Sequence, residues 1–152
     1  MSADSLESFV AGINEDGTHL CILDSIGSNE SQRDGRKWII FNYEVIDENS
    51  DIEGEELREF YEDFSHLTVD EFKMLPPADK RKVRMAIRRK RDRLESLGVP
   101  EENLDGFDDY ESLRGLRVHV VVETSTGTKK DPESGKDMKT KYTNIRNVSL
   151  AD

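Results

Sequence analysis

The sequence of 152 residues lacks several features that mark secreted or membrane proteins. It has one cysteine, Cys21, which excludes an intramolecular disulfide framework and is typical of a reducing compartment. No apolar run approaches the roughly 20 residues that a membrane-spanning helix needs. The opening MSADSLESF is acidic, unlike the basic and then apolar pattern of a signal peptide. We therefore expect a soluble cytoplasmic protein in which Cys21 is buried filler.

The chain also lacks the groupings of residues on which enzymes and metal sites are built. Its three histidines fall in different segments, without a second histidine or a cysteine at metal-ligand spacing. No glycine-rich segment ends in the Gly-Lys-Ser/Thr of a phosphate-binding loop. The run from Asp47 to Asp51 resembles the start of a calcium loop, but Ile52 stands where glycine is needed and Arg58 where glutamate is needed. The sequence predicts a non-catalytic protein with no metal and no cofactor.

Charge is abundant and unevenly placed. Charged residues make up 36% of the chain and hydrophobic residues 34%, so we expect a lean core. The net charge of -11 hides a basic segment: residues 73–97 hold 10 basic and 3 acidic side chains, whereas residues 1–72 hold 4 basic and 19 acidic ones. Most of this positive charge lies in the stretch KRKVRMAIRRKRDRLESL. Net charge alone is therefore a poor guide to the partners of this protein.

Alternation of apolar and polar residues predicts several strands. The clearest is RKWIIFNYEVID, residues 36–47, in which Ile39 and Phe41 fall on one face and Trp38 falls on the other. Further strands are predicted at 18–27, 113–125 and 139–150, with a loop at 126–138 that holds two strong turn signals. Residues 55–64, EELREFYEDF, fit a strand or a helix, and a hairpin after the preceding strand is plausible.

A helical segment is predicted between the third and fourth strands. Thr68 and Glu71 form the pattern of a capping box, and the prolines at 76 and 77 end that first helical turn. A second helix is predicted from about residue 78 to residue 97, with Gly98 as its terminator. A helical wheel divides this helix into an apolar arc and an adjacent basic flank. The apolar arc consists of Val83, Ala86, Ile87, Leu94 and Leu97.

The order of these elements predicts a mainly β fold with an inserted helical segment. Three strands, a helix and two strands follow one another as in a five-stranded OB-like barrel, whose helix lies between strands 3 and 4. We expect residues 1–152 to form one such domain, with the helical insertion at about 66–98 and an acidic connector at about 99–112. The alternative is an open α+β sheet of the same elements.

An OB barrel binds oligonucleotides near the loops that join strands 1 and 2 and strands 4 and 5. Here both loops bring cations beside an aromatic residue, and single strands need cations for phosphates and aromatic rings for base stacking. Other interpretations remain open: Trp38 also fits a structural place at the end of the barrel or under the helix, and the loop lysines also fit a solvated hairpin without a binding role. The predicted binding residues are Arg36, Lys37, Trp38, Lys129, Lys130, Lys136, Lys139, Lys141 and Tyr142.

Two segments also resemble a known family. GRKWIIFNYEVIDENSDIEGEELREFY and LRGLRVHVVVETSTGT, followed by TKYTNIRNVSL, are similar to bacteriophage-encoded single-stranded DNA-binding proteins of the OB type. The shared features are a strand that ends in a valine and an acidic turn, a glycine before the next strand, and the pattern L-x-G-x-x-V-x-V-x-V. The resemblance implies an accessory role in phage DNA replication or recombination, with single-stranded DNA as partner and the host cytoplasm as location.

The acidic third strand departs from this family, because a surface that binds DNA is not expected to be negative. Arg84, Arg88 and Arg91 of the basic helix are therefore a secondary contact, made either with nucleic acid or with a protein partner. The alternative function is a protein–protein interaction module that self-associates or docks on an acidic partner, such as a replication protein, through this helix. Neither function involves a membrane.

Overall fold

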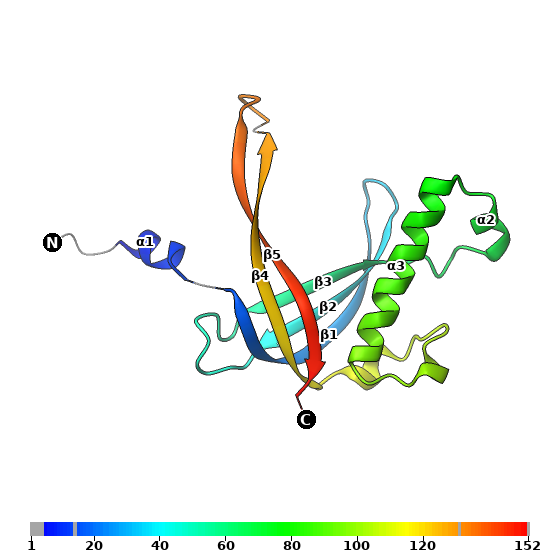
Figure 1. Ribbon diagram of the computed structural model, residues 1–152, viewed down its shortest axis with the longest axis horizontal. Coiled ribbons are helices and arrows are strands. Elements are labelled where there is room, and N and C mark those ends of the chain that lie inside the picture. Colours follow the sequence, from blue (N-terminus) through cyan, green and yellow to red (C-terminus); the bar gives the residue numbers. More distant parts are fainter. Residues whose placement is uncertain (1–4, 14, 131, 152) are drawn as a thin grey trace.

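The computed structural model describes residues 5–13, 15–130 and 132–151 (Figure 1). Its strands are β1 (Gly17–Glu30), β2 (Lys37–Val45), β3 (Glu56–Glu62), β4 (Arg117–Lys130) and β5 (Asp137–Leu150). Its helices are α1 (Leu6–Ala11), α2 (Val69–Lys73) and α3 (Pro77–Ser96), with 3-10 turns at Glu101–Asn103 and Tyr110–Leu113. Within these described residues, no helix has the length and apolar character that crossing a membrane requires.

The five strands form one antiparallel sheet in the order β3-β2-β1-β4-β5. The mainly β fold and the helices between the third and fourth strands are as predicted, and the segment that fitted a strand or a helix forms the strand β3 over residues 56–62. The sheet is not closed into a barrel, since its edge strands β3 and β5 do not pair. A cleft of about 370 Å³ lies between these edges, lined by Arg58 on one side and by Thr143 and Ile145 on the other.

Two long hairpins extend beyond the centre of the sheet as separate arms (Figure 1). One arm is the outer half of β1–β2, which follows a register shift between Leu23 and Ser25. The other is the outer half of β4–β5, which pairs as far as Lys130 with Asp137. The prediction of a loop over residues 126–138 is therefore wrong at both ends. Threonines recur in this arm, and their branched side chains suit a strand better than the neighbouring turn signals suggested.

The core lies on one face of the sheet. The alternation predicted for β2 is confirmed: Ile39, Phe41, Tyr43 and Val45 are all buried. They pack with inward residues of the other strands and of α3, including Cys21, Leu23, Leu57, Val118, Val120, Val148 and Leu94. On the opposite, outer face, none of the described helices lies over β2 and β3, and the side chains there are partly or fully exposed.

Helix α3 covers the inner face, as its apolar arc predicts. Val83, Leu94 and Leu97 are buried, and Gly98 ends the helix with a φ of 92°, a value that glycine adopts without strain. The predicted capping box at the start of α2 is also present. Ile87 differs from the prediction because it is 50% exposed: it borders an open cavity, so no core residue covers it completely.

An ion pair with little exposure to solvent joins α3 to the sheet: the side chains of Arg93 and Glu59 are 12% and 9% exposed. The Arg93 guanidinium donates to both carboxylate oxygens of Glu59 on β3, with Nη2 2.9 Å from Oε2. Glu59 also accepts hydrogen bonds from the hydroxyls of Tyr43, at 2.7 Å, and of Tyr61, at 2.9 Å. Burial, followed by the charge of Glu59, raises the pKa of both tyrosines well above the ordinary value, so both hydroxyls remain protonated donors.

We predict that Glu59→Leu lowers the free energy of unfolding by about 3–5 kcal/mol, because it leaves Arg93 charged and unpaired in the interior. The double variant Glu59→Leu/Arg93→Met should lose less than Glu59→Leu alone, since no buried charge remains. Urea denaturation measures both effects. The exposed pair of Arg114 with Glu111 supplies the control, as Glu111→Leu should cost less than about 1 kcal/mol. Additive losses in the double variant would contradict this account.

Candidate nucleic-acid interface

Apolar and aromatic side chains that are partly or fully exposed gather on the outer face of β2 and β3. The antiparallel register sets Ile40 opposite Phe60 and places Trp38 two residues along the same face. Phe60 is 51% exposed, and Trp38 and Ile40 are half-buried. Together with Asn29 they line a shallow hollow of about 310 Å³. We call Trp38, Ile40 and Phe60 the outer aromatic face; Phe60 was not predicted, because its strand was not separated from a helix by pattern alone.

Arg36 lies over the indole of Trp38, as the prediction of a cation beside this ring requires. Its guanidinium carbon is 4.6 Å from the ring centroid, within the range of a cation–π contact. The same guanidinium binds Glu62 at 3.1 Å through Nε and at 2.6 Å through Nη2. This hydrogen bonding holds the pKa of Glu62 below its usual 4.5. Arg36 therefore steadies the ring, but Glu62 already offsets its charge.

Lys37 follows in the same strand and is exposed. Because consecutive strand residues point to opposite sides, Lys37 and Trp38 do not share a face. The register pairs Lys37 with Glu30 across the β1–β2 arm, so an acidic residue lies beside this cation as well. Arg33, in the turn of that arm, is fully exposed. Its neighbour in the same turn is the acidic Asp34, so no cation of this arm lies far from an acidic residue.

Tyr142 occupies the second arm, on β5. It is 47% exposed, and its ring lies against Gly127 of β4. A Cβ added at Gly127 would meet Tyr142 Cε2 at 2.6 Å, so only glycine leaves room for the ring in this position. Glycine at 127 thus keeps an aromatic ring against the ribbon, where its other face is available to a stacking partner.

The predicted lysines of this arm are distributed along both strands and the turn. Lys130 and Lys136 are exposed at the end of the arm. Lys129, Lys139 and Lys141 lie in the paired ladder, and their side chains are outside the described part of the structure. The sheet places Trp38 and Tyr142 on different arms, which project to the same side of the molecule at the top of Figure 1. The outer aromatic face and Tyr142 are therefore two separate aromatic surfaces and do not form one contiguous stack.

The cations of α3 divide into paired and unpaired groups. Arg91, which was predicted as a contact, binds Asp105 at 2.7 Å, and that hydrogen bond raises the pKa of Arg91. Arg84 and Arg88 are exposed, and none of the described residues forms an ion pair with either. Only Arg84 and Arg88 of the three predicted residues thus present free charge on this helix.

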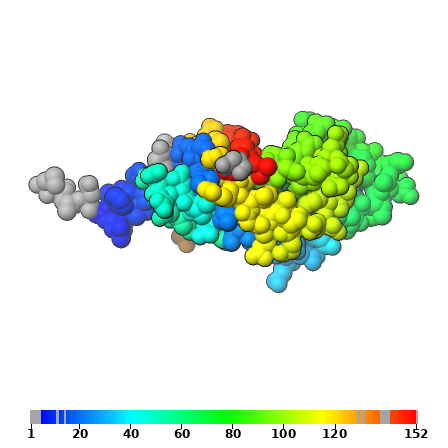
Figure 2. Space-filling view, turned by 90° about the horizontal axis from the view of Figure 1, so that it is seen from below, coloured from blue at the N-terminus to red at the C-terminus, as the bar shows by residue number. Residues whose placement is uncertain are grey.

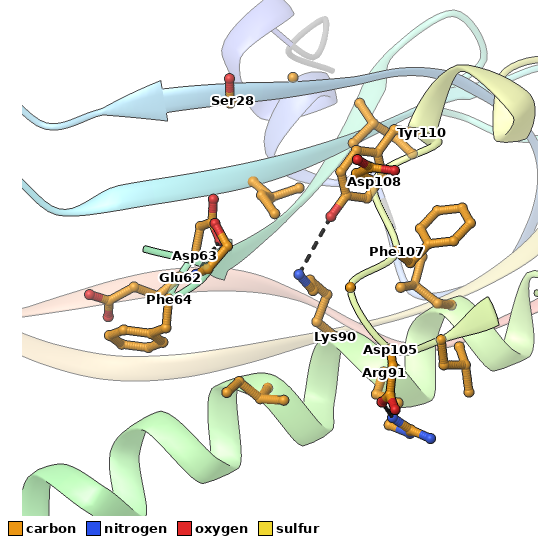
Figure 3. Close-up of a pocket in the computed structure, with 18 residues that line it drawn as sticks. Ser28, Glu62, Asp63, Phe64, Lys90, Arg91, Asp105, Phe107, Asp108 and Tyr110 are labelled. Carbon is orange, nitrogen blue, oxygen red and sulfur yellow. Dashed lines mark hydrogen bonds and ion pairs between the residues drawn. The ribbon is translucent and has the colours of Figure 1, made fainter. Parts of the chain in front are cut away.

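A cavity of about 580 Å³ lies on the inner side, between α3, the β1–β2 arm and the acidic connector (Figure 3). Lys90 projects into it from the inward arc of α3, and its Nζ lies 3.4 Å from the hydroxyl of Tyr110. Burial, together with the charges of Asp63 and Asp108, raises the pKa of Tyr110 to about 12. The sequence did not reveal this cavity, because residues far apart in the chain form its walls.

Neither a metal site nor a reactive thiol accompanies these surfaces in the described part of the chain. Among those residues, no group of three or more histidine, cysteine or acidic side chains is placed to hold a metal ion. Cys21 is fully buried, as predicted, and burial followed by the charge of Asp47 raises the pKa of its thiol to about 12. At neutral pH the thiol is therefore protonated and packs as a small apolar group.

No protein-family model and no curated protein matches this chain. The surfaces described above are therefore the guide to function. Among them, the outer aromatic face combines two partly exposed rings with a defined strand register, whereas Arg91 and Lys90 at the inner cavity already bind Asp105 and Tyr110.

We predict a measurable pH dependence from the Arg36–Glu62 contact. The folded-state pKa of Glu62 is lowered, so its contribution to stability is complete above the ordinary value of 4.5 and is lost as the pH falls through the folded-state pKa. Thermal unfolding of the wild type and of Arg36→Gln between about pH 3 and pH 6 measures this contribution. The two stabilities should converge as the pH falls; a constant difference across the range would contradict the assignment.

Proposed function

We propose that this protein binds single-stranded DNA, without catalysis, on the outer face of its β2–β3 strands. The observation that carries the proposal is the outer aromatic face, where the exposed Phe60 and the half-buried Trp38 lie with Ile40 on neighbouring strands. Bases of any sequence stack on such rings, at roughly 1–3 kcal/mol per base. Exposed rings on adjacent strands of a rigid sheet suit an extended strand of bases better than an isolated surface aromatic does.

The arrangement of strands supports an OB-like interpretation of the fold. The order β3-β2-β1-β4-β5, with helices between β3 and β4, is the order of an OB barrel in which the seam between β3 and β5 is left open. In that fold, oligonucleotides bind over strands 2 and 3, between the two long hairpin loops. The outer aromatic face occupies the corresponding strands here, and Tyr142 stands on the second hairpin.

We expect base stacking to supply more of the proposed binding energy than contacts with phosphates do. Glu62 offsets the charge of Arg36, and the remaining candidate cations lie toward the ends of the two arms. If all eight cations of the two arms contacted phosphates, the slope of log affinity against log salt would be about -6. Because Glu62 already binds Arg36 and Glu30 lies opposite Lys37, we expect a shallower slope. An accessory role in phage DNA replication or recombination follows from the family resemblance and is part of the same proposal.

The test is a titration of the protein with oligo-dT, followed by the fluorescence of Trp38, which is the only tryptophan in the sequence. Binding should quench this fluorescence. Phe60→Ala, which leaves the fluorophore in place, should weaken binding by roughly 5- to 150-fold, the equivalent of one stacked base. Gly127→Ala should weaken it by a smaller factor, because it displaces the Tyr142 ring without removing it.

A matched control is Leu150→Ala, which truncates a similarly exposed side chain at the far end of β5. It should leave the affinity unchanged. Duplex DNA of the same length should bind more weakly than the single strand, because paired bases cannot stack on protein rings. Equal affinity of Phe60→Ala and wild type for oligo-dT would overturn the assignment of this face, and absence of binding at low salt would overturn the function.

A further inference from the structure

We infer that the exposed basic face of α3 docks on the acidic β2–β3 connection of a second copy of this chain, so that the protein associates head to tail. The contact itself does not depend on DNA and goes beyond the proposed function. Its consequence for coating a long strand does rest on that function.

The basic half of the contact is a set of three arginines on one helical face: Arg81, Arg84 and Arg88. Their spacing of three and four residues keeps them in one row along α3. All three are exposed, and no ion pair joins them to any described residue. The neighbouring row of α3 differs, because Lys82 and Arg93 are paired with glutamates of β3. The glutamates of β3 thus pair with one side of the helix, and the arginines on the other side have no ion-pair partner among the described residues.

The acidic half is the connection between β2 and β3, residues 46–55, which holds five acidic residues and no basic one. Glu48, Asp51 and Glu53 are exposed, and no cation among the described residues pairs with them. At the base of this connection the register sets Glu44 directly opposite Glu56. Arg58 binds Glu56 at 3.4 Å and partly offsets this pair of like charges within the chain, whereas Glu48, Asp51 and Glu53 remain available to a cation from outside.

The two charged regions lie at opposite ends of the sheet and helix body. In Figure 1 the β2–β3 connection is on the left and α3 is on the right, and the space-filling view of Figure 2 shows the same separation. One chain therefore cannot satisfy both regions by itself. A contact between unlike surfaces of two copies is heterologous, and it propagates into rings or filaments because each added copy exposes the same two ends.

A protein partner fits the α3 face better than a nucleic-acid backbone does. Met85 is 43% exposed beside the three arginines, which adds an apolar element to the charged row. Asp92 and Glu95 continue the same face toward the end of the helix, and both are exposed. A phosphate backbone that follows the helix would meet these carboxylates, whereas a compact acidic loop needs to cover only the arginine half.

The experiment is sedimentation velocity of the full chain without DNA, over a range of concentrations at about 20 mM and about 500 mM salt. The wild type should associate with rising concentration at low salt and sediment as one protomer at high salt. Two reversal variants should each stay monomeric: Arg81→Glu/Arg84→Glu/Arg88→Glu, and Glu48→Lys/Asp51→Lys/Glu53→Lys. The chain that carries both sets should regain association, and so should an equimolar mixture of the two variants, because their charges are again complementary.

The control is Arg114→Glu/Arg117→Glu/Arg146→Glu, which changes the net charge by the same amount at exposed sites in and just before β4 and in β5, away from the predicted binding residues. It should associate like the wild type. A monomeric wild type at low salt, or failure of the double reversal to restore association, would overturn the inference. The same variants titrated with oligo-dT long enough for one protomer separate the two proposals. If the α3 reversal weakens that binding and leaves self-association intact, the face contacts nucleic acid and the inference is wrong.

Failure of the proposed function alone has a different signature. The wild type would then associate head to tail in a salt-dependent way and show no affinity for either short or long strands. If both proposals hold, long oligo-dT should bind cooperatively, and the α3 reversal should remove the cooperativity while the affinity for the short strand remains within about twofold.

Discussion

The ion pair between Arg93 and Glu59 determines which side of the sheet is available. It fixes α3 over the inner face, together with the hydroxyls of Tyr43 and Tyr61 and the apolar contacts of Leu94 and Leu97. With that side covered by α3 and the connector, a macromolecular partner has the outer face of β2 and β3 left to use. The acidic third strand then has a structural explanation, because two of its glutamates, Glu59 and Glu62, form ion pairs with Arg93 and Arg36.

The docking of α3 on the sheet also determines where the basic residues of the helix lie. The basic segment of the sequence is not one surface, because α3 distributes its cations among three environments. Lys82 and Arg93 hold the helix to β3, Lys90 enters the inner cavity, and Arg81 begins the free row on the outside. The strongest polyanion signal in the sequence is thus partly structural, and its free part lies on α3, the helix that covers the inner face of the sheet. Stacking on Trp38 and Phe60 is the more direct basis for binding a strand of bases.

Short sequence patterns predicted the features that depend on residues close together in the chain. The alternation in β2 identified Ile39 and its neighbours as core, and the Thr68–Glu71 capping box identified the start of a helix. Features that depend on contacts between distant residues were not predicted. The pairing of β3 with β2 places Phe60 on the outer face, opposite Ile40. Lys90 lies one turn of α3 before the buried Leu94, but it lines the inner cavity instead of the core.

The open seam of the sheet and the long β4–β5 arm belong to the same class. Whether two edge strands pair depends on the curvature of the whole sheet, which no short window of sequence records. The turn signals at Pro132 and Gly135 were real, but the threonine-rich flanks extend the strands up to them on both sides. A pattern can thus locate a turn more accurately than it locates the ends of the strands around it.

The central claim is that a single strand lies on the outer aromatic face. It is tested most directly by an NMR titration with short oligo-dT that follows the indole Nε1–H of Trp38 and the ring and methyl signals of the two sides of the sheet. The account predicts large shifts for Trp38, Ile40 and Phe60 and unchanged signals for Tyr110 in the inner cavity. Shifts confined to Tyr110 and Lys90, with the outer aromatic face unchanged, would contradict it.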